Sequence, residues 1–483
     1  MLNWALALLS AALLILTFPK ANITWLAPVA LAPLLVAVAR ELRPFRRFLL
    51  GWGAGVVYWF GVCYWIQYDL AIFGGVSDGV AWALFLLFAV AKALHLAVFA
   101  LLAGWLMRRW WAAPAVAALW VAVEVTHGPL GFAWLTLGNA GIEMGIPMRL
   151  APFTGVYGLS FLFAMMAAAV ALAALRRPRK ELLWLALAPL TILLPRMPEA
   201  RPGAETALLV QPNLSESEEW TAPSLDRMEQ RLVELSLRGV LADIAHPPSI
   251  VVWPEMPAPL YSDDANFRKY ATDLTSTARA YLLTGVVAHT PEKASLNSVL
   301  LLSPVGIPLS RYDKVNLVPF GEFVPWPFGF VSKISTEAGD FAAGKRVVVS
   351  PIAGHRLGTF ICYESVFPNF VRQFARDGAE VLFNVSNDGW FGKSSARQQH
   401  LEIVRMRAAE NRRWLLRATN DGITATIDPA GRLRRTLPLY TEGTLTSGFS
   451  YLADKTLYTR FGDWFPMLCA VATLAFLIAE RAL

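Results

Sequence analysis

The chain has 483 residues, of which 55% are hydrophobic and only 16% are charged, whereas about 25% are charged in a typical soluble domain. With a mean hydropathy of +0.44, this composition excludes a disordered chain, a collagen-like fibre and an ordinary soluble globule. It favours a membrane protein with a soluble part, and the length leaves room for two folding units.

The charges are divided unevenly along the chain. Residues 1–200 hold 14 of the 43 Lys and Arg and 7 of the 36 Asp and Glu, so they carry the whole net charge of +7. Residues 201–483 carry 29 charges of each sign. A basic excess among apolar stretches argues against nucleic-acid binding, which needs a basic patch on a soluble face. It is typical of the loops that flank membrane helices.

Eight apolar stretches are predicted to cross a membrane as helices, seven in residues 1–195 and one in residues 463–480. Of these, Leu182–Leu194 is short and Trp464–Ala479 is borderline, since a span needs roughly 17–25 apolar residues. The other six are Leu2–Phe18, Ile23–Ala39, Phe48–Ile66, Val80–Met107, Trp110–Thr126 and Gly155–Leu175.

Basic residues gather in the loops between stretches two and three, four and five, and six and seven. This distribution predicts an orientation for the chain. Three alternate loops hold ten basic residues, and the loops between them hold only Lys20 and Arg149. The positive-inside rule then places the N-terminus in the cytoplasm and residues 196–460 outside it. If Leu182–Leu194 does not cross, that domain is cytoplasmic instead. The ten are Arg40, Arg43, Arg46, Arg47, Arg108, Arg109, Arg176, Arg177, Arg179 and Lys180.

Two ionisable residues, Lys92 and Glu124, lie at membrane depth. Such residues either line a path for a polar substrate or belong to a structural pair near a helix end. The sequence leaves both interpretations open.

From Ala204 onward, short β-rich runs alternate with helical patterns, which predicts an α/β domain with helices covering its sheets. The helices are expected at Leu225–Ala245, Phe370–Arg376 and Gln398–Arg413. The strands are expected at Ala207–Gln211, Ile250–Trp253, Tyr281–Val287, Asn297–Ser303, Val347–Ser350, Leu357–Ile361, Glu380–Val385, Leu415–Thr419 and Ile423–Ile427.

Three segments of this domain carry polar residues near strand ends, where open α/β sheets place their sites. Val251–Glu255 ends in Glu255, Arg311–Glu322 contains Lys314, and Gly358–Glu364 contains Cys362. A carboxylate can take the proton of a thiol, and an ammonium group can stabilise both the thiolate and an oxyanion. Taken singly, a lone cysteine is more often buried packing, and a strand-end glutamate is usually solvated.

Together the segments W-P-E, Y-x-K-x-x-L-V-P-F-G-E and C-Y-E resemble the nitrilase (carbon–nitrogen hydrolase) superfamily over about residues 204–445. That resemblance implies an αββα sandwich with a Glu-Lys-Cys triad. With the apolar stretches included, nearly the whole chain is similar to the apolipoprotein N-acyltransferase family of bacterial inner membranes. The phrases at 317–325 (L-V-P-F-G-E-F-V-P) and 384–392 (N-V-S-N-D-G-W-F-G) carry this second likeness.

The resemblance implies a role for each site residue. Cys362 would be the nucleophile, Glu255 the general base, and Lys314 the oxyanion stabiliser, together with the backbone N–H of Tyr363. The remaining candidates would support the reaction: Glu322 and Glu364 orient Lys314 or the incoming amine, or form structural ion pairs; Trp220 lines the substrate entrance; and Trp390 is pocket wall or core.

The implied reaction has two steps. Cys362 takes an acyl chain from a phospholipid as a thioester, and the free α-amino group of a diacylglyceryl-cysteine apolipoprotein then accepts it. This predicts a multi-pass inner-membrane enzyme with a periplasmic catalytic domain. The apolar segment Phe323–Phe330, with the loop that follows to Phe341, is a candidate lid that excludes water from the thioester.

Two alternatives remain open at this point. One is a membrane-anchored amidase that hydrolyses a soluble substrate, and the other is a non-enzymatic lipid-binding or transport protein with a degenerate nitrilase module. The sequence contains no P-loop, no dinucleotide fingerprint and no zinc-spaced Cys and His cluster, so neither a metal nor a cofactor is expected.

Overall fold

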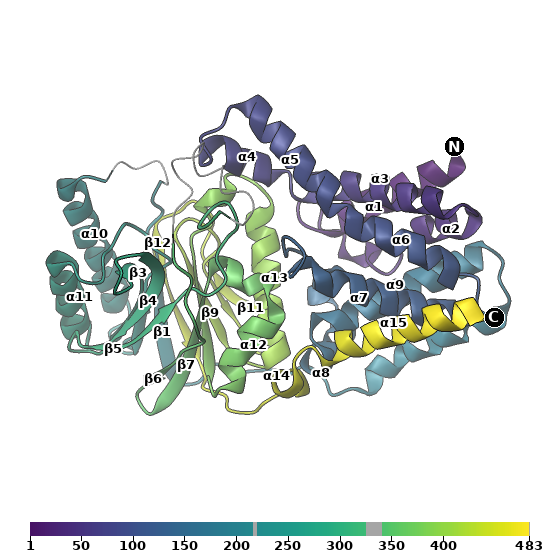
Figure 1. Ribbon diagram of the computed structural model, residues 1–483. Coiled ribbons are helices and arrows are strands. Elements are labelled where there is room, and N and C mark those ends of the chain that lie inside the picture. The colour runs from purple at the N-terminus through teal and green to yellow at the C-terminus, as the bar shows by residue number, and fades with distance from the viewer. Residues whose placement is uncertain (216–219, 325–340, 483) are drawn as a thin grey trace. The chain divides into compact units, whose positions relative to one another are not determined.

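The computed structural model describes residues 1–215, 220–324 and 341–482. The chain forms two compact units (Figure 1). The helical unit comprises Met1–Ala71, Ser77–Met197 and Thr456–Leu483. The sheet unit comprises Pro198–Lys455 and the short segment Ile72–Val76, which the helical part of the chain contributes to it.

The helical unit is built from α-helices joined by short 3-10 turns. Its α-helices are α1 (Leu2–Thr17), α2 (Ala32–Arg40), α3 (Pro44–Val62), α4 (Trp65–Ile72), α5 (Asp78–Lys92), α6 (Leu94–Leu106), α7 (Ala112–Glu124), α8 (Ala151–Thr154), α9 (Val156–Ala174), α14 (Leu457–Phe461) and α15 (Trp464–Ala482). Its 3-10 helices are η1 (Thr24–Leu26), η2 (Val125–His127), η3 (Leu137–Glu143), η4 (Pro147–Leu150), η5 (Arg179–Leu187) and η6 (Pro189–Leu193).

Small residues let α3 and α6 approach closely. A Cβ atom built on Gly51 would lie 2.3 Å from Ala100 Cβ, and one on Gly55 would lie 2.9 Å from Ala93 Cβ. The two glycines are four residues apart, so they lie on one face of α3. Such small-xxx-small faces are how helices pack when lipid supplies no hydrophobic driving force.

Several of the expected spans are shorter in the structure than the bilayer requires. In the described part of the chain, two helical stretches, Asp78–Leu106 and Val156–Ala174, are long and apolar enough to cross a membrane. A third is added if α3 and α4, which bend by 60° between them, count as one span. Leu2–Thr17, Ala112–His127 and Trp464–Glu480 are shorter apolar helices. The full eight-span arrangement therefore stays a prediction.

Two six-stranded sheets form the core of the other unit. The first has the order β12-β1-β2-β3-β4-β5 and the second β11-β10-β9-β8-β7-β6. The first contains β1 (Glu205–Gln211), β2 (Ile250–Val252), β3 (Tyr281–His289), β4 (Ser295–Leu302), β5 (Pro308–Asp313) and β12 (Gly443–Phe449). The second contains β6 (Val349–Ile352), β7 (His355–Ile361), β8 (Val381–Ser386), β9 (Leu415–Thr419), β10 (Ala425–Ile427) and β11 (Leu433–Thr436).

Alternating side chains of β1 place the first sheet between two cores. Ala207 and Leu209 pack in a cluster that also holds Leu357 and Phe360 of the second sheet. Leu208 and Val210 point the other way, into a cluster with residues of α10 (Ala222–Leu241) and α11 (Ala265–Ala278). This period of two is the strand geometry expected of a sheet buried on both faces.

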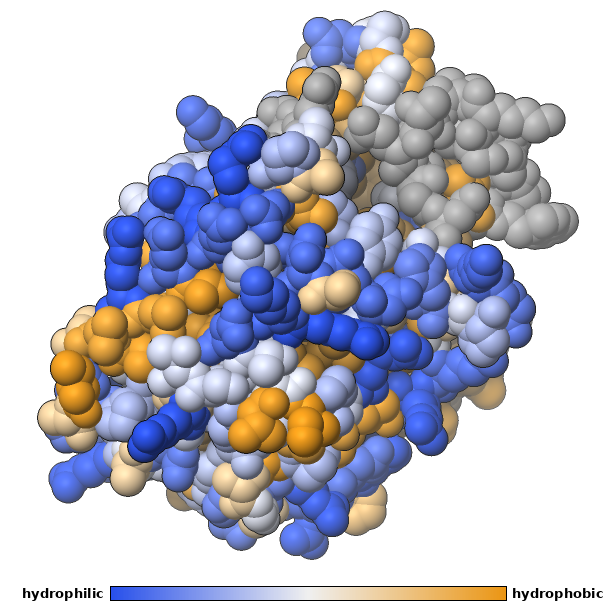
Figure 2. Space-filling view, turned by 90° about the vertical axis from the view of Figure 1, so that its left-hand side faces the viewer, coloured by the Kyte–Doolittle hydropathy of each residue, from blue (hydrophilic) through white to orange (hydrophobic). Residues whose placement is uncertain are grey.

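Helices cover the outer face of each sheet, so the layers run helix, sheet, sheet, helix (Figure 1). The second sheet is covered by α12 (Pro368–Arg376) and α13 (Ala396–Asn411). Viewed from the side of α10 and α11, the surface is predominantly hydrophilic with smaller apolar patches (Figure 2). The predicted α/β sandwich is confirmed, although α11, β5, β11 and β12 were not predicted from the sequence.

Candidate active site

Three of the predicted residues follow strands of the two sheets. Glu255 lies three residues after β2, and Lys314 follows β5 directly, both in the first sheet. Cys362 follows β7 of the second sheet and begins the 3-10 helix η8 (Cys362–Val366). All three side chains are buried. Close packing behind Glu255 depends on Gly285 of β3, because a Cβ atom there would lie 2.5 Å from Pro254 O.

A compact charge cluster joins the first sheet's residues. The Lys314 ammonium donates hydrogen bonds to Glu255 Oε1 at 3.0 Å and to Glu322 Oε1 at 2.9 Å. Glu322 Oε2 accepts from the backbone N–H of Val318 at 2.8 Å, and Glu255 Oε2 accepts from that of Asn387 at 2.9 Å. Burial acts to lower the pKa of Lys314, but the two carboxylates outweigh it and the pKa stands well above its ordinary value.

Asn297 of β4 was missed by the sequence analysis. Its amide nitrogen donates to Glu255 Oε1 and to Glu322 Oε1, at 2.8 Å in each case, and it is buried. Lys314 and Asn297 are neighbours because the Lys314 backbone N–H donates to Asn297 O across the sheet. The available signal was a polar residue inside the apolar strand S-L-N-S-V-L-L-L.

Cys362 adopts an unusual backbone conformation, with φ of +47° in the left-handed region. Its side chain is 7% exposed. Burial and the Glu255 charge raise the pKa of the thiol, while the Lys314 charge and a contact from Ser386 lower it, and the net shift is upward. The thiol is therefore protonated at rest, and a base must remove its proton before it can act as a nucleophile.

Glu364 accepts hydrogen bonds from backbone N–H groups and a tyrosine hydroxyl, and not from Lys314. Its Oε1 accepts from Tyr312 Oη at 2.6 Å and from the backbone N–H of Val315 at 2.7 Å, and its Oε2 accepts from that of Ile361 at 2.8 Å. Burial raises the pKa of Glu364 to about 7, against the opposing effect of these hydrogen bonds. Glu364 thus ties the segment after Lys314 to the strand that ends at Cys362.

The three aromatic candidates lie in different surroundings. Tyr363 is buried, with its ring 5.3 Å from that of Phe367. Trp220 is half-buried and packs against the cluster beneath α10 and α11. Trp390 is 40% exposed and meets the ring of Phe73 edge-on at 4.6 Å, so the interpretation of Trp390 as a core residue is wrong.

The candidate lid is described only in part. Residues 325–340, which form most of the segment from Phe323 to Phe341, lie outside the described residues. Just before them, Phe320 and Phe323 are joined by a backbone hydrogen bond of 2.7 Å from Phe320 N–H to Phe323 O.

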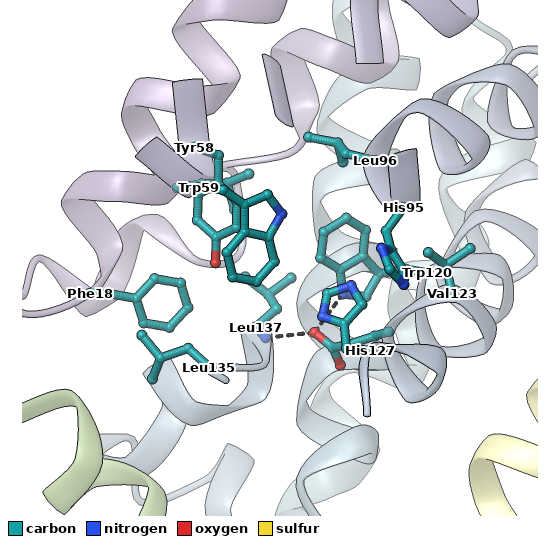
Figure 3. Close-up of a pocket in the computed structure, with 12 residues that line it drawn as sticks. Phe18, Tyr58, Trp59, His95, Leu96, Trp120, Val123, His127, Leu135 and Leu137 are labelled. Atoms are coloured by element: carbon teal, nitrogen blue, oxygen red, sulfur yellow. Dashed lines mark hydrogen bonds between the residues drawn. The ribbon is translucent and has the colours of Figure 1, made fainter. Parts of the chain in front are cut away.

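The helical unit contains a pocket whose lining includes Trp59, Trp120 and His127 (Figure 3). Glu124 lines it and accepts hydrogen bonds from Leu137 N–H at 2.7 Å and from Trp120 Nε1 at 3.1 Å. Lys92 lies over the ring of Trp59, with its nitrogen 5.1 Å from the ring centroid. These contacts give Glu124 a structural role, because it fixes the loop after α7 to its own helix.

Within the described ranges, no group of three or more His, Cys, Asp and Glu side chains is arranged to hold a metal ion.

Known proteins are similar to this chain along almost its whole length. Residues 210–450 match the carbon-nitrogen hydrolase family model, and residues 10–169 match the model of the apolipoprotein N-acyltransferase N-terminal domain. The apolipoprotein N-acyltransferase of Geobacter metallireducens is 35% identical, over 98% of this chain and 95% of its own. The chain belongs to the apolipoprotein N-acyltransferase family.

Two further apolipoprotein N-acyltransferases are similar over almost as much sequence. The protein of Azotobacter vinelandii is 33% identical over 99% of this chain and 95% of its own, and that of Pseudomonas syringae pv. tomato is 32% identical over 91% and 90%. Both predicted families are confirmed, and the carbon-nitrogen hydrolase match covers the sheet unit that holds Glu255, Lys314 and Cys362.

Proposed function

We propose that this protein is an apolipoprotein N-acyltransferase that moves an acyl chain from a phospholipid to the α-amino group of a diacylglyceryl-cysteine apolipoprotein. The observation that carries the proposal is the buried Glu255–Lys314–Glu322 cluster, of which Glu255 and Lys314 also act electrostatically on the Cys362 thiol. It is supported by similarity to named N-acyltransferases over at least 90% of both chains.

In the first half-reaction, Glu255 takes the proton of the Cys362 thiol and the thiolate attacks the ester carbonyl of the phospholipid. The negative charge that develops on the carbonyl oxygen is stabilised by the Lys314 ammonium and the backbone N–H of Tyr363. Collapse re-forms the carbonyl, and the lysophospholipid alkoxide leaves with the proton from Glu255. The product is an acyl thioester on Cys362.

In the second half-reaction, the free amine of the lipoprotein attacks the thioester and gives its proton to Glu255. The tetrahedral intermediate uses the same two donors, and the Cys362 thiolate leaves and recovers the proton. Both substrates bind in turn at one nucleophile, so the kinetics are expected to be ping-pong.

Glu322 supports this cycle by holding the ammonium. When Glu255 becomes protonated, its attraction for Lys314 weakens, while Glu322 remains 2.9 Å from the same nitrogen. The ammonium therefore keeps its charge and its place as the oxyanion forms.

We also propose that the chain crosses the bacterial inner membrane eight times with the sheet unit on the periplasmic side. The seventh span lies within η5 and η6, which run from Arg179 to Leu193. A 3-10 helix rises about 2.0 Å per residue, so the apolar residues 182–193 reach about 24 Å, whereas an α-helix of the same length would reach about 18 Å. The tighter winding brings the short sequence closer to the roughly 30 Å of the hydrocarbon core.

Intact-protein mass spectrometry after incubation with phospholipid alone tests the catalytic proposal. An added acyl mass, released by hydroxylamine and absent in Cys362→Ala, is expected. A diacylglyceryl-cysteine peptide should then remove it as an amide product. Well-folded protein in lipid that forms no adduct would refute the acyltransferase, and release of ammonia from small amides would identify an amidase instead.

The orientation is tested with cysteines at two exposed positions, Leu42 and Ile244. A membrane-impermeant maleimide added to cells with a permeabilised outer membrane should label Ile244→Cys and leave Leu42→Cys unlabelled. The reverse pattern would place the sheet unit in the cytoplasm.

A further inference from the structure

A buried polar network lies behind Cys362 and has no role in the mechanism so far. His400 of α13 is fully buried, and its Nε2 lies 3.2 Å from the backbone carbonyl oxygen of Cys362. Its Nδ1 lies 3.1 Å from Asp388 Oδ1 and 3.2 Å from Arg417 Nη2. The hydroxyl of Ser365 is also close, at 2.8 Å from Nε2.

The contact with Cys362 is a hydrogen bond when Nε2 carries a proton, because a carbonyl oxygen can only accept. Nδ1 faces an acceptor, Asp388 Oδ1, and a donor, Arg417 Nη2, which also donates to Asp388 Oδ2 at 2.7 Å. With the proton at Nε2, Nδ1 accepts from Arg417, whose guanidinium lies between the ring and the carboxylate. Burial and the positive charge of Arg417 lower the pKa of His400, whereas Asp388 and the Cys362 contact act to raise it.

The Cys362 carbonyl belongs to the same planar peptide as the Tyr363 N–H. In a trans peptide these two groups point in opposite directions, so fixing the oxygen also fixes the direction of the N–H. Cys362 has a positive φ, a conformation that costs a non-glycine residue free energy and persists only when its surroundings hold it. His400 supplies such a restraint on the carbonyl side.

We propose that His400 is a positioning residue that orients the Cys362–Tyr363 peptide so that the Tyr363 N–H donates to the oxyanion. The inference rests on the proposed acyl transfer through Cys362. His400 itself exchanges no proton in the reaction. The carbon–oxygen double bond opens as the carbon–sulfur bond forms, and the N–H contributes only a hydrogen bond to the oxygen.

Two amide variants separate the nitrogens of the ring. In His400→Asn the amide lies where Nδ1 was, so the bond to the Cys362 carbonyl is lost. In His400→Gln the amide reaches the position of Nε2 and can keep it. Loss of one oxyanion donor costs about 10²–10³ in rate, so Asn should slow acylation by roughly a hundredfold and Gln by less than about tenfold. Ser365→Ala, which leaves the carbonyl bond in place, is the matched control.

Alkylation of Cys362 by iodoacetamide, followed by peptide mass spectrometry, provides the second readout. This substitution occurs at a CH₂ carbon and forms no oxyanion, so its rate in His400→Asn should equal that of the wild type. Parallel loss of alkylation and acylation would mean that His400 acts on the thiol or on the fold, and would overturn the proposal. Unchanged acylation in His400→Asn would overturn it as well.

The acyl donor distinguishes this inference from the proposed function. Acylation by a p-nitrophenyl fatty-acyl ester is measured in the wild type and in the His400 variants, and it does not require a phospholipid site. Acylation by phospholipid is measured in the wild type alone. Wild type that reacts with the activated ester but not with phospholipid would refute the proposed donor and leave the His400 test intact. If His400→Asn does not fold, the acylation-to-alkylation ratio of His400→Gln decides, and a hundredfold drop there refutes the inference.

Discussion

The two sheets of the sandwich contribute to one site in different ways. The first supplies a charge cluster: Glu255 and Glu322 both bind the Lys314 ammonium, at 3.0 and 2.9 Å. The second supplies Cys362, the proposed nucleophile, and a set of hydrogen bonds around it. The sequence predicts the same role for Glu364 as for Glu322. Glu364 instead accepts hydrogen bonds from Tyr312 Oη and from the backbone N–H groups of Val315 and Ile361. A glutamate next to a catalytic motif can thus serve either the chemistry or the backbone.

The largest effect is expected from removing the cation of the first sheet. In Lys314→Met, Glu255 and Glu322 face each other without a counter-charge. Loss of one partner of a buried ion pair costs about 3–5 kcal/mol, and the Cys362 thioester should not form. Denaturant unfolding in detergent and intact-mass acylation measure the two effects. Lys314→Met combined with Glu322→Gln should recover stability but not acylation. An unchanged free energy of unfolding in Lys314→Met alone would contradict the presence of two ionised carboxylates around the ammonium.

Exchange of the two similar glutamates for glutamine sharpens the contrast between the sheets. Glu364→Gln should lower the free energy of unfolding by about 2–3 kcal/mol, because its NH₂ group must face one of the buried N–H donors. Glu322→Gln should cost less stability but slow acylation more than it slows alkylation of Cys362. Thermal midpoints and acylation rates of the two variants test whether Glu364 mainly supports stability and Glu322 mainly supports acylation. Equal stability losses in the two variants would contradict this difference.

Asn297 should matter less, because each carboxylate keeps Lys314 and a backbone N–H as donors. Asn297→Ala removes one donor from each, with an expected loss of about 1–3 kcal/mol. Asn297→Asp adds a third acid to the cluster and should be worse than alanine above pH 6. Unfolding measured at two pH values separates these variants, and an aspartate as stable as alanine at high pH would argue against two ionised partners.

The smallest effect concerns a carboxylate whose pKa is raised by burial and by neighbouring acids. Glu229 of α10 is buried on the outer side of the first sheet, and burial, with Asp264 and Asp226 nearby, raises its pKa to about 7. The unfolded chain loses this proton near pH 4.3, so the folded state loses stability as pH rises from there to about 7. Glu229→Gln should be more stable than wild type at pH 8 by about 1–2 kcal/mol and equal at pH 4; a constant difference would contradict the shift.

Two of the missed elements, β5 and β12, lack the local pattern of a buried strand. β5 is an edge strand with exposed residues, and β12 has the polar sequence G-T-L-T-S-G-F. β12 is nevertheless a strand because β1 pairs with it along seven residues, from Glu205 with Phe449 to Gln211 with Gly443. Its partner lies more than 200 residues away, so periodicity in the strand itself could not reveal it.

The sequence by itself determined the family, the α/β class of the sheet unit and the three strand-end residues Glu255, Lys314 and Cys362. Apolar runs that end in a polar residue are local features, so they can be recognised in a single sequence. Only the tertiary structure decided that Asn297 joins the carboxylates, that Glu322 and Glu364 have different partners, and that His400 contacts the Cys362 carbonyl. Each of these is a hydrogen bond between residues distant in sequence, and its donor and acceptor are chosen by packing rather than by local pattern.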